Sequence, residues 1–340
     1  MVDIAVAHTA SPRVSAYPWS PGFGTKYTNP SPVPAGNCRG VSFSSGAVVV
    51  AHATSPFVTA YSWSSGFGSK YANPGTALAG GGFGVSFNST FTLVAVAHSV
   101  SPFVSIYDWS SGFGSKYSDP GTVPANVGRG VAFNSTSTFV VVSHASTPYV
   151  TAYPFSSGFG SKYSDPGTAP TGTGYGVAIG GSAVAVAHAG SPYTTVYNFS
   201  SGFGTKYSDP VTLPGSTYGY GVAFDSTSAN IAVARAGSPG VSAYPWSSGF
   251  GTKYSNPATV PAGNARGVAF TGSGISVASK GSPYIQAYPF SSGFGSKYSD
   301  PGTVPTGYGY GVAFSPAGGG GGGTASDNRV STIPMAIFAM

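Results

Sequence analysis

Short apolar runs separated by turn-forming residues recur along the whole chain. One unit contains the runs Gly130–Phe133 (GVAF), Phe139–His144 (FVVVSH) and Pro148–Phe155 (PYVTAYPF), followed by the more polar segment Gly158–Pro166 (GFGSKYSDP). Many residues in these runs are β-branched or aromatic, and Gly, Pro, Ser and Thr separate the runs, which is typical of strands joined by turns. The continuously apolar run 139–144 indicates a strand that is covered on both faces. The unit therefore predicts four strands, with the short polar segment as the outer edge strand.

This unit occurs seven times. The Phe of its GFG sequence recurs every 44 to 47 residues, at Phe23, Phe67, Phe113, Phe159, Phe203, Phe250 and Phe294. Repeats of about 40–45 residues are typical of the four-stranded blades of β-propellers. We therefore predict an all-β fold in which residues 1–316 form one domain, a seven-bladed β-propeller.

The two ends of the repeat array predict how the ring closes. The chain begins directly in a strand of the second type, Ile4–His8, and no GVAF strand precedes it. An additional GVAF strand, Gly311–Phe314, follows the last complete unit. Pairing of these two segments would place both ends of the array in one blade and leave only short outer edges.

The succession GVAF, VAVAH and SPxVxAYPW resembles WD40-type repeats. Trp19, Trp63, Trp109 and Trp246, with Phe155, Phe199 and Phe290, occupy the place of the family's Trp at the end of the third strand. The Asp that precedes this Trp in the family is matched only by Asp108, and the family's Gly-His pair is missing, so its polar network is not implied. The style of the repeat (PWSSGFGTKYSNPATVPAGNARGVAF) is more loosely similar to propeller repeats in virion proteins of tailed phages.

The composition excludes several classes of protein. Only 6% of residues are charged, Glu is absent, and the net charge of +6 comes from scattered basic residues, so we expect no specific nucleic-acid partner. Cys38 is the only cysteine, which excludes an intrachain disulfide and a cysteine metal site. No run approaches the roughly 18 apolar residues of a membrane span, so we expect no membrane insertion. The N-terminus lacks the features of a signal peptide.

Two polar positions recur in the outer turn of the repeat. The residue before Pro in the outer turn is Asn or Asp: Asn29, Asn73, Asp119, Asp165, Asp209, Asn256 and Asp300. Both types start turns, but only Asp can act as an acid or base, so the exchange favours a structural role. A Lys three residues earlier either protects exposed strand edges or forms a basic girdle.

Five units place a histidine at the end of the second strand. These residues are His8, His52, His98, His144 and His188. Equivalent residues of different blades lie far apart, so we predict that each His caps its own blade and that no metal or other cofactor is bound.

The position just before Gly-Val breaks the uniformity of the repeat. It is occupied by Arg39, Phe83, Arg129, Tyr175, Tyr220, Arg266 and Tyr310. The WD40 resemblance implies that these residues surround the channel mouth on one face. Aromatic rings with arginine donors suit sugar rings, bases and protein anchors, so this set is the candidate binding site. The alternative is that these side chains only pack the channel mouth.

The repeat pattern stops after Phe314. The glycines Gly318–Gly323 predict a flexible tether, so residues 317–340 form a separate tail. Its apolar end suits docking onto another subunit, through Ile333, Pro334, Met335, Ile337, Phe338 and Met340. The alternative is a segment folded back onto its own propeller.

These features together predict a structural and interaction protein, with no catalytic residues and no enzymatic activity. The expected setting is a phage virion component (a tail fibre, baseplate or capsid-surface protein) or another extracellular particle. The alternative localisation is secretion by a route that needs no signal peptide. Its partners would be other copies or other structural proteins. A lectin-like propeller that recognises a cell-surface glycan is the alternative, and an intracellular WD40-style scaffold is the third hypothesis.

Overall fold

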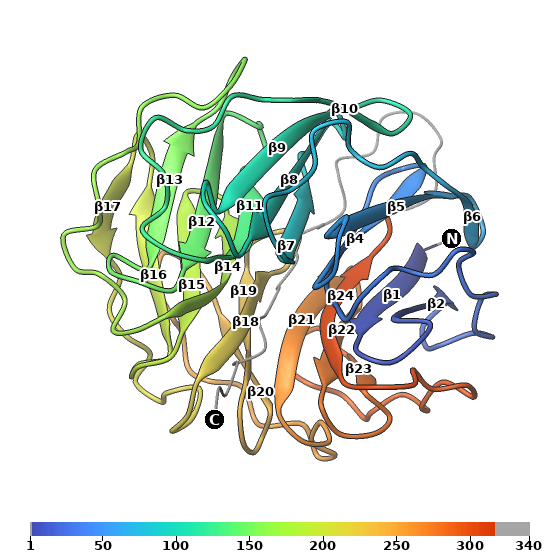
Figure 1. Cartoon of the computed structure of the whole chain (residues 1–340). Helices are drawn as coiled ribbons and strands as arrows, with labels where there is room; N and C mark the ends of the chain where they lie inside the picture. Colours follow the sequence, from blue (N-terminus) through green and yellow to red (C-terminus); the bar gives the residue numbers. More distant parts are fainter. Residues whose placement is uncertain (1, 317–340) are drawn as a thin grey trace, which may run out of the picture.

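The computed structural model describes residues 2–316, and these residues form strands and turns without any helix. Seven small antiparallel sheets surround a common centre (Figure 1). From the centre outwards, the sheets are β24 (Gly309–Phe314), β1 (Val2–His8) and β2 (Val14–Trp19); β3 (Cys38–Phe43), β4 (Ala47–His52), β5 (Val58–Trp63) and β6 (Phe67–Lys70); β7 (Gly82–Phe87), β8 (Leu93–His98), β9 (Val104–Trp109) and β10 (Phe113–Lys116); β11 (Gly128–Phe133), β12 (Phe139–His144) and β13 (Val150–Pro154); β14 (Gly174–Gly180), β15 (Ala183–His188), β16 (Thr194–Phe199) and β17 (Phe203–Lys206); β18 (Gly219–Phe224), β19 (Asn230–Arg235) and β20 (Val241–Pro245); and β21 (Ala265–Thr271), β22 (Gly274–Ser279) and β23 (Ile285–Pro289).

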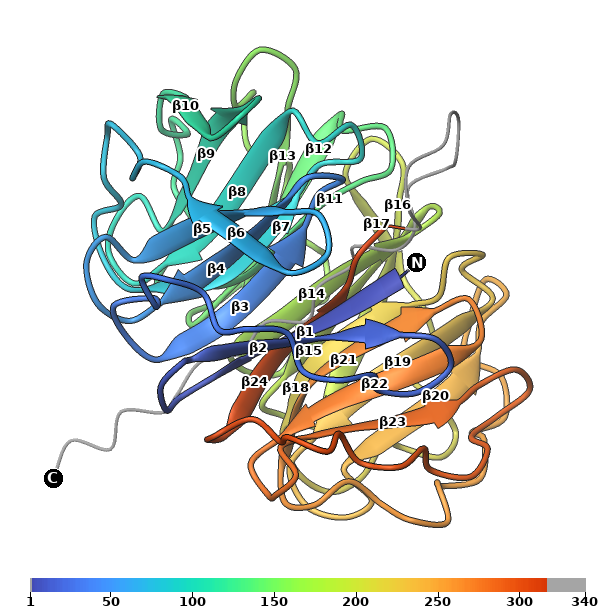
Figure 2. The ribbon, with the colours of Figure 1, turned by 90° about the vertical axis from the view of Figure 1, so that its right-hand side faces the viewer.

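The first strands of the seven sheets contact one another in a closed cycle. The order is β3, β7, β11, β14, β18, β21, β24 and back to β3. β24 also lies beside β1 (Figure 2). The register of this pair sets Ala5 opposite Ala313 and Val6 opposite Val312. The arrangement is consistent with a seven-bladed β-propeller. Residues 2–316 contain no helix that could cross a membrane.

The hydrophobic core lies between successive sheets. In one such layer Val49 of β4 packs in the same cluster as Val94 and Val96 of β8. The second strand of each sheet is therefore apolar on both faces, as its continuous apolar sequence indicates.

Aromatic contacts and hydrogen bonds also tie the last sheet to the first. Tyr298 meets Trp19 edge to face, with ring centres 5.4 Å apart. The Tyr17 hydroxyl donates a hydrogen bond to the carbonyl oxygen of Thr303, at 2.9 Å. The same two contacts link consecutive sheets elsewhere, so the junction between the chain ends resembles the other junctions.

The predicted fourth strand is complete in only three sheets. In the other four the segment forms an isolated bridge instead of a strand, such as Phe155 with Phe159, which corrects the four-stranded prediction for that unit. These four sheets carry proline near the end of the third strand, at Pro18, Pro154, Pro245 and Pro289. Proline has no N–H to donate to a neighbouring strand, and the three complete sheets have Ser62, Asp108 and Asn198 at this position.

Glycine allows the inner strands to approach closely. A Cβ atom at Gly311 would lie 2.7 Å from the carbonyl oxygen of Arg39 on the next inner strand. At Gly267 it would lie 2.4 Å from the carbonyl oxygen of Tyr310. Only glycine fits these positions without movement of the neighbouring backbone, so the repeated Gly of Gly-Val sets the spacing of the inner strands.

Candidate functional site: a ring of arginine and aromatic residues

Each member of the predicted channel-mouth set is the second residue of an inner strand. The strands and their residues are β3 with Arg39, β7 with Phe83, β11 with Arg129, β14 with Tyr175, β18 with Tyr220, β21 with Arg266 and β24 with Tyr310. Because the inner strands contact one another in a cycle, the fold brings all seven positions to one end of the central strands. We call this set the Arg–aromatic ring.

A local irregularity in the strand pairing occurs at every one of these residues. In the first complete sheet Cys38 pairs with His52 and Gly40 pairs with Ala51, so Arg39 is an extra residue without a partner opposite it. The registers of the other six inner strands shift at the same place. A β-bulge of this kind redirects a side chain and is common beside active sites.

Contacts on one half of the ring alternate between cations and aromatic faces. The Arg39 guanidinium lies 4.2 Å from the centre of the Phe83 ring. The Arg129 guanidinium lies 5.6 Å from the Phe83 ring and 5.5 Å from the Tyr175 ring. These distances are within the range of cation–π attraction.

The other half continues the same chain of contacts. The rings of Tyr175 and Tyr220 have centres 5.1 Å apart. The Arg266 guanidinium lies 3.7 Å from the Tyr220 ring and 5.8 Å from the Tyr310 ring. Tyr310 and Arg39 occupy equivalent positions on β24 and β3, which contact each other, so the last and first members of the set are neighbours. The structure therefore brings all seven predicted residues together.

The ring is a concentrated positive site of limited exposure. Arg39 and Arg266 are 8% and 5% exposed. Burial lowers the pKa of the Arg39 guanidinium, while interaction with Tyr310 raises it and the charge of Arg129 lowers it. Burial likewise raises the pKa of Tyr310, and Arg266 lowers it. Because guanidinium groups stay protonated in proteins, three positive charges share the ring.

The acidic residues of the described chain make their contacts elsewhere. Seven of the eight lie within residues 2–316, and all are aspartates. Four of them pair with lysines in the outer turns, namely Asp119, Asp165, Asp209 and Asp300. The remaining three are Asp3, bonded to Tyr27 and Trp63, Asp108, bonded to Tyr117, and Asp225, bonded within its own hairpin. The ring is thus composed of cations and aromatic groups.

Each of the five histidines lies opposite the residue that comes just before the ring residue on the neighbouring inner strand, as His52 lies opposite Cys38. Each histidine Nε2 forms a hydrogen bond with a Ser or Thr hydroxyl seven residues later, such as His144 with Thr151 at 2.9 Å. Burial lowers the pKa of His144 to about 4 and that of His8 to about 3. Among residues 2–316 no group of three His, Cys, Asp or Glu side chains is close enough to hold a metal ion.

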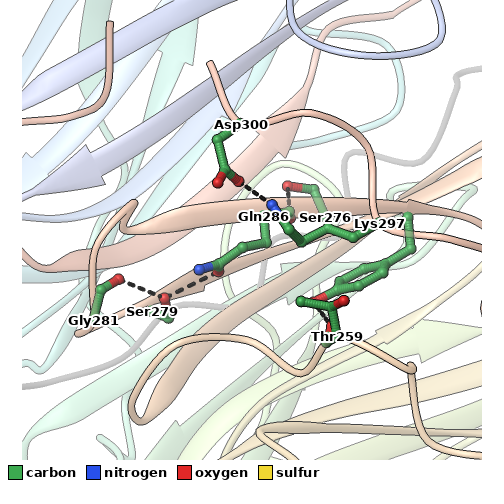
Figure 3. A network of polar contacts seen from close by, with 8 residues as sticks. Thr259, Ser276, Ser279, Gly281, Gln286, Lys297 and Asp300 are labelled. Carbon is green, nitrogen blue, oxygen red and sulfur yellow. Dashed lines mark hydrogen bonds and ion pairs between the residues drawn. The ribbon is translucent and has the colours of Figure 1, made fainter. Parts of the chain in front are cut away.

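One sheet replaces this histidine pair with a different polar pair. Ser279 Oγ lies 3.1 Å from Oε1 of Gln286 and 3.2 Å from the carbonyl oxygen of Gly281 (Figure 3). In the histidine pairs the large side chain is on the second strand and the small one on the third. Here the small side chain, Ser279, is on β22 and the large one, Gln286, is on β23. The exchange preserves a buried hydrogen bond without an ionisable group.

The lysines of the outer turns bond locally. Lys70 Nζ donates to Oδ1 of Asn73 at 2.6 Å, and the other six lysines make the same bond to the Asx residue three positions later. Each lysine therefore holds its own turn. The predicted docking residues of the tail, from Ile333 to Met340, lie outside the described residues.

Sequence reasoning missed three residues near the ring. Tyr218 and Tyr308 precede β18 and β24 and are each 49% exposed, and Lys280 follows β22 with its Nζ 5.6 Å from the Tyr308 ring. The sequence alone could have indicated these three residues, because most other units carry small or uncharged residues at the equivalent positions.

Comparisons with known proteins identify the class of fold. No protein-family model and no curated protein matches the sequence. A functionally unknown protein from Desulfotomaculum acetoxidans is 12% identical with a TM-score of 0.65, and the match covers 92% of this chain and 98% of that one. The periplasmic gluconolactonase of Pseudomonas aeruginosa is 12% identical with a TM-score of 0.66, over 92% and 99% of the two chains. A Bacteroides fragilis protein whose name proposes 6-phosphogluconolactonase activity is 8% identical with a TM-score of 0.65, over 92% and 97%. At these identities the likeness shows the fold alone, which matches the propeller fold of 6-phosphogluconolactonase-like proteins.

These matches correct the functional prediction. The expected non-enzymatic phage virion component is wrong, because none of these three proteins is named as a virion protein and two are named for lactonase activity. The prediction that the chain is not an enzyme fails for the same reason. Sequence reasoning had assigned the repeated Asp residues to turns and expected no catalytic residues, whereas this fold gathers one side chain from each of seven inner strands. The looser resemblance to phage proteins rested on the style of the repeat, and the comparisons do not show it.

Proposed function

We propose that the chain is a closed seven-bladed β-propeller that binds a small anionic sugar derivative at the Arg–aromatic ring. The observation that carries this proposal is the interleaving of three guanidinium groups with four aromatic rings at seven bulged positions. Guanidinium groups bind carboxylate and phosphate through paired hydrogen bonds, and aromatic faces pack against flat apolar surfaces.

The ring also departs from the rest of the molecule in a way that supports binding. The outer-turn lysine is kept in all seven units and the buried histidine in five, because each sheet meets the same packing requirement at these positions. At the ring the type changes between Arg, Tyr and Phe. The bulges hold these side chains at the common centre, where groups from different sheets can contact one ligand.

The class of ligand is suggested by the fold comparison. The similar structures include proteins named for gluconolactone and 6-phosphogluconolactone. Their reaction products, gluconate and 6-phosphogluconate, are anionic, and therefore they suit a cationic ring. A guanidinium near a lactone carbonyl would also stabilise the oxyanion that forms during hydrolysis, so lactone hydrolysis is measured together with binding.

Calorimetric titration with 6-phosphogluconate, gluconate and glucose tests the proposal. We expect both anions to bind, glucose to bind far more weakly, and Arg39→Met to weaken anion binding by about tenfold or more, as for a lost charged hydrogen bond. Arg39→Lys keeps the charge and should lose less affinity. Lys70→Met, in an outer turn, is the control and should bind like the wild type.

Two results would contradict the proposal. The first is equal binding of glucose and the two anions. The second is unchanged anion affinity in an Arg39→Met protein that unfolds cooperatively like the wild type.

A further inference from the structure

The sevenfold repeat is broken most strongly on one side of the Arg–aromatic ring. Directly after the second strand, six units have a small uncharged residue, and the seventh has Lys280. The six are Thr9, Ala53, Ser99, Ala145, Ala189 and Ala236. Two residues before each ring residue, only Tyr218 and Tyr308 are aromatic, and the other five units have Asn37, Gly81, Val127, Thr173 and Asn264. All three exceptions fall in three successive sheets, those of β18, β21 and β24.

The backbone places Lys280 beside the ring. Ala265 pairs with Ser279, and the Lys280 amide donates a hydrogen bond to the carbonyl oxygen of Asn264, at 3.0 Å. Arg266 is the next residue after Ala265, so the two cations stand at the same end of paired strands. The Lys280 ammonium lies 5.6 Å from the centre of the Tyr308 ring, and that ring is half exposed.

The charges on this side of the ring favour an anion. Burial lowers the pKa of Lys280, and the positive charge of Arg266 lowers it further. The pKa of Lys253, in the outer turn of the preceding sheet, is also lowered by burial, but Lys253 bonds to Asn256. The aspartate of the adjacent hairpin, Asp225, lies beyond the opposite end of β18 and bonds within its own turn. A group with two negative charges can neutralise Lys280 and Arg266 together, whereas a single carboxylate neutralises only one of them.

The exposed tyrosines add a second requirement. Tyr308 contacts Tyr284 edge to face, with ring centres 6.2 Å apart, and Tyr218 contacts Tyr175 and Tyr220 in the same manner, at 6.4 and 6.0 Å. Both side chains are therefore held by neighbouring rings while half of their surface stays in solvent. Exposed aromatic surface of this kind gains from contact with the face of a sugar or other flat ring.

We propose that Lys280, Arg266 and Tyr308 form a phosphate-selective subsite, in which the two cations bind a phosphate monoester and Tyr308 packs against the ring that carries it. Tyr218 borders the subsite on the other side of β21. This inference rests on the proposed function and adds to it that the ligand is phosphorylated and lies over β18, β21 and β24, not over the opposite half of the ring.

Titration of the full chain with glucose 6-phosphate, glucose, gluconate and inorganic phosphate tests the subsite. We expect glucose 6-phosphate to bind more tightly than gluconate. Lys280→Ala introduces the residue found at four equivalent positions, so it should fold, and it should weaken glucose 6-phosphate binding about tenfold, as for loss of one charged contact. Gluconate binding should change by less than about twofold, since it needs only one cation. Lys70→Ala, at the outer rim, is the matched control.

A second variant separates a sugar phosphate from free phosphate as the source of the anion. Tyr308→Asn introduces the residue found at two equivalent positions, and it should weaken glucose 6-phosphate binding while leaving inorganic phosphate unaffected. If Tyr308→Asn leaves glucose 6-phosphate binding unchanged, the ring-packing role is wrong. If Lys280→Ala binds glucose 6-phosphate like the wild type while Arg266→Met does not bind it, the phosphate subsite is wrong and the proposed anion site stands. If the wild type binds none of the anions, both proposals fail.

Discussion

The inner end and the outer turn of each sheet differ in how much the sequence varies. In the outer turn every unit places a lysine against Asn or Asp three residues later, and the contact is the same seven times. At the inner end the bulged residue is Arg in three sheets, Tyr in three and Phe in one. The comparison separates two roles: repeated contacts hold one sheet together, and varied side chains meet side chains from other sheets.

The comparison can be tested by asking which changes alter stability and which alter ligand affinity. Changes at repeated positions should lower the free energy of unfolding and leave anion binding intact in the folded protein. Changes at the Arg–aromatic ring should weaken anion binding and have little effect on the free energy of unfolding.

The largest effect is expected from acid. The histidine pKa values are held at about 3 to 4 in the folded protein, against 6.5 without burial, so the unfolded chain binds more protons as the pH falls below 6.5. The free energy of unfolding is therefore highest above pH 6.5 and decreases as the pH falls towards 4. At pH 4 the loss is about 3 kcal/mol for each histidine. Denaturant unfolding between pH 8 and pH 4 measures this loss.

A double substitution sharpens the acid prediction. His144→Ser with Thr151→Gln introduces the pair that Ser279 and Gln286 form in another sheet. The pH dependence should shrink by about one fifth, since one of five histidines is removed. An unchanged pH dependence would show that buried histidines do not cause the acid sensitivity.

Crowding at the inner strands should have the next largest effect. Gly311→Val places a Cβ 2.7 Å from the carbonyl oxygen of Arg39, and the new methyl groups need still more space. We expect a loss of about 3 kcal/mol, as for other overpacked sites, in urea unfolding. Gly302→Ala is the control, because no atom lies within 4 Å of its new Cβ. Equal stability of the two variants would contradict the close approach of β24 and β3.

Removal of one hydroxyl at the junction of the chain ends should cost less. Tyr17→Phe removes the donor to Thr303 at 2.9 Å, with an expected loss of about 1 kcal/mol. Tyr288→Phe removes the equivalent bond to Thr259, also at 2.9 Å, between two other sheets. Thermal unfolding should show similar losses in both variants if the junction is equivalent to the others, and no loss in Tyr17→Phe if the ends are open.

The smallest effect is expected at the outer rim. Lys116→Met removes the ion pair with Asp119, whose carboxylate is half exposed, and should cost less than about 1 kcal/mol. Lys70→Met removes a bond to a neutral Asn73 and should cost a similar amount or less. Anion binding that weakens in either variant would give the outer rim a ligand-binding role and contradict the assignment of binding to the Arg–aromatic ring.

Much of the fold follows from the sequence, because the repeat and its apolar runs are both local. The spacing of Phe23 and its six equivalents predicted the seven units, and the GVAF run at 311–314 marked the strand that pairs with β1. The loss of the fourth strand in four units could also have been predicted from Pro18 and its equivalents. The rule that proline does not donate to a strand partner was sufficient.

The site was only partly predictable. The break in uniformity at Arg39 and its equivalents indicated residues that the fold brings together, but the bulge that redirects them depends on the register of two strands, which residue types alone do not determine. The partners of His144 and Lys70 depend in the same way on neighbouring strands and turns. The misleading features were the low charge, the apolar tail and the style of the whole repeat, which together suggested a virion protein.

A crystal structure of the protein with glucose 6-phosphate would locate the bound anion. We expect the phosphate group within hydrogen-bond distance of Arg266 and Lys280, with the sugar ring against Tyr308. A sugar phosphate bound between the outer turns, with the Arg–aromatic ring unoccupied, would contradict this expectation.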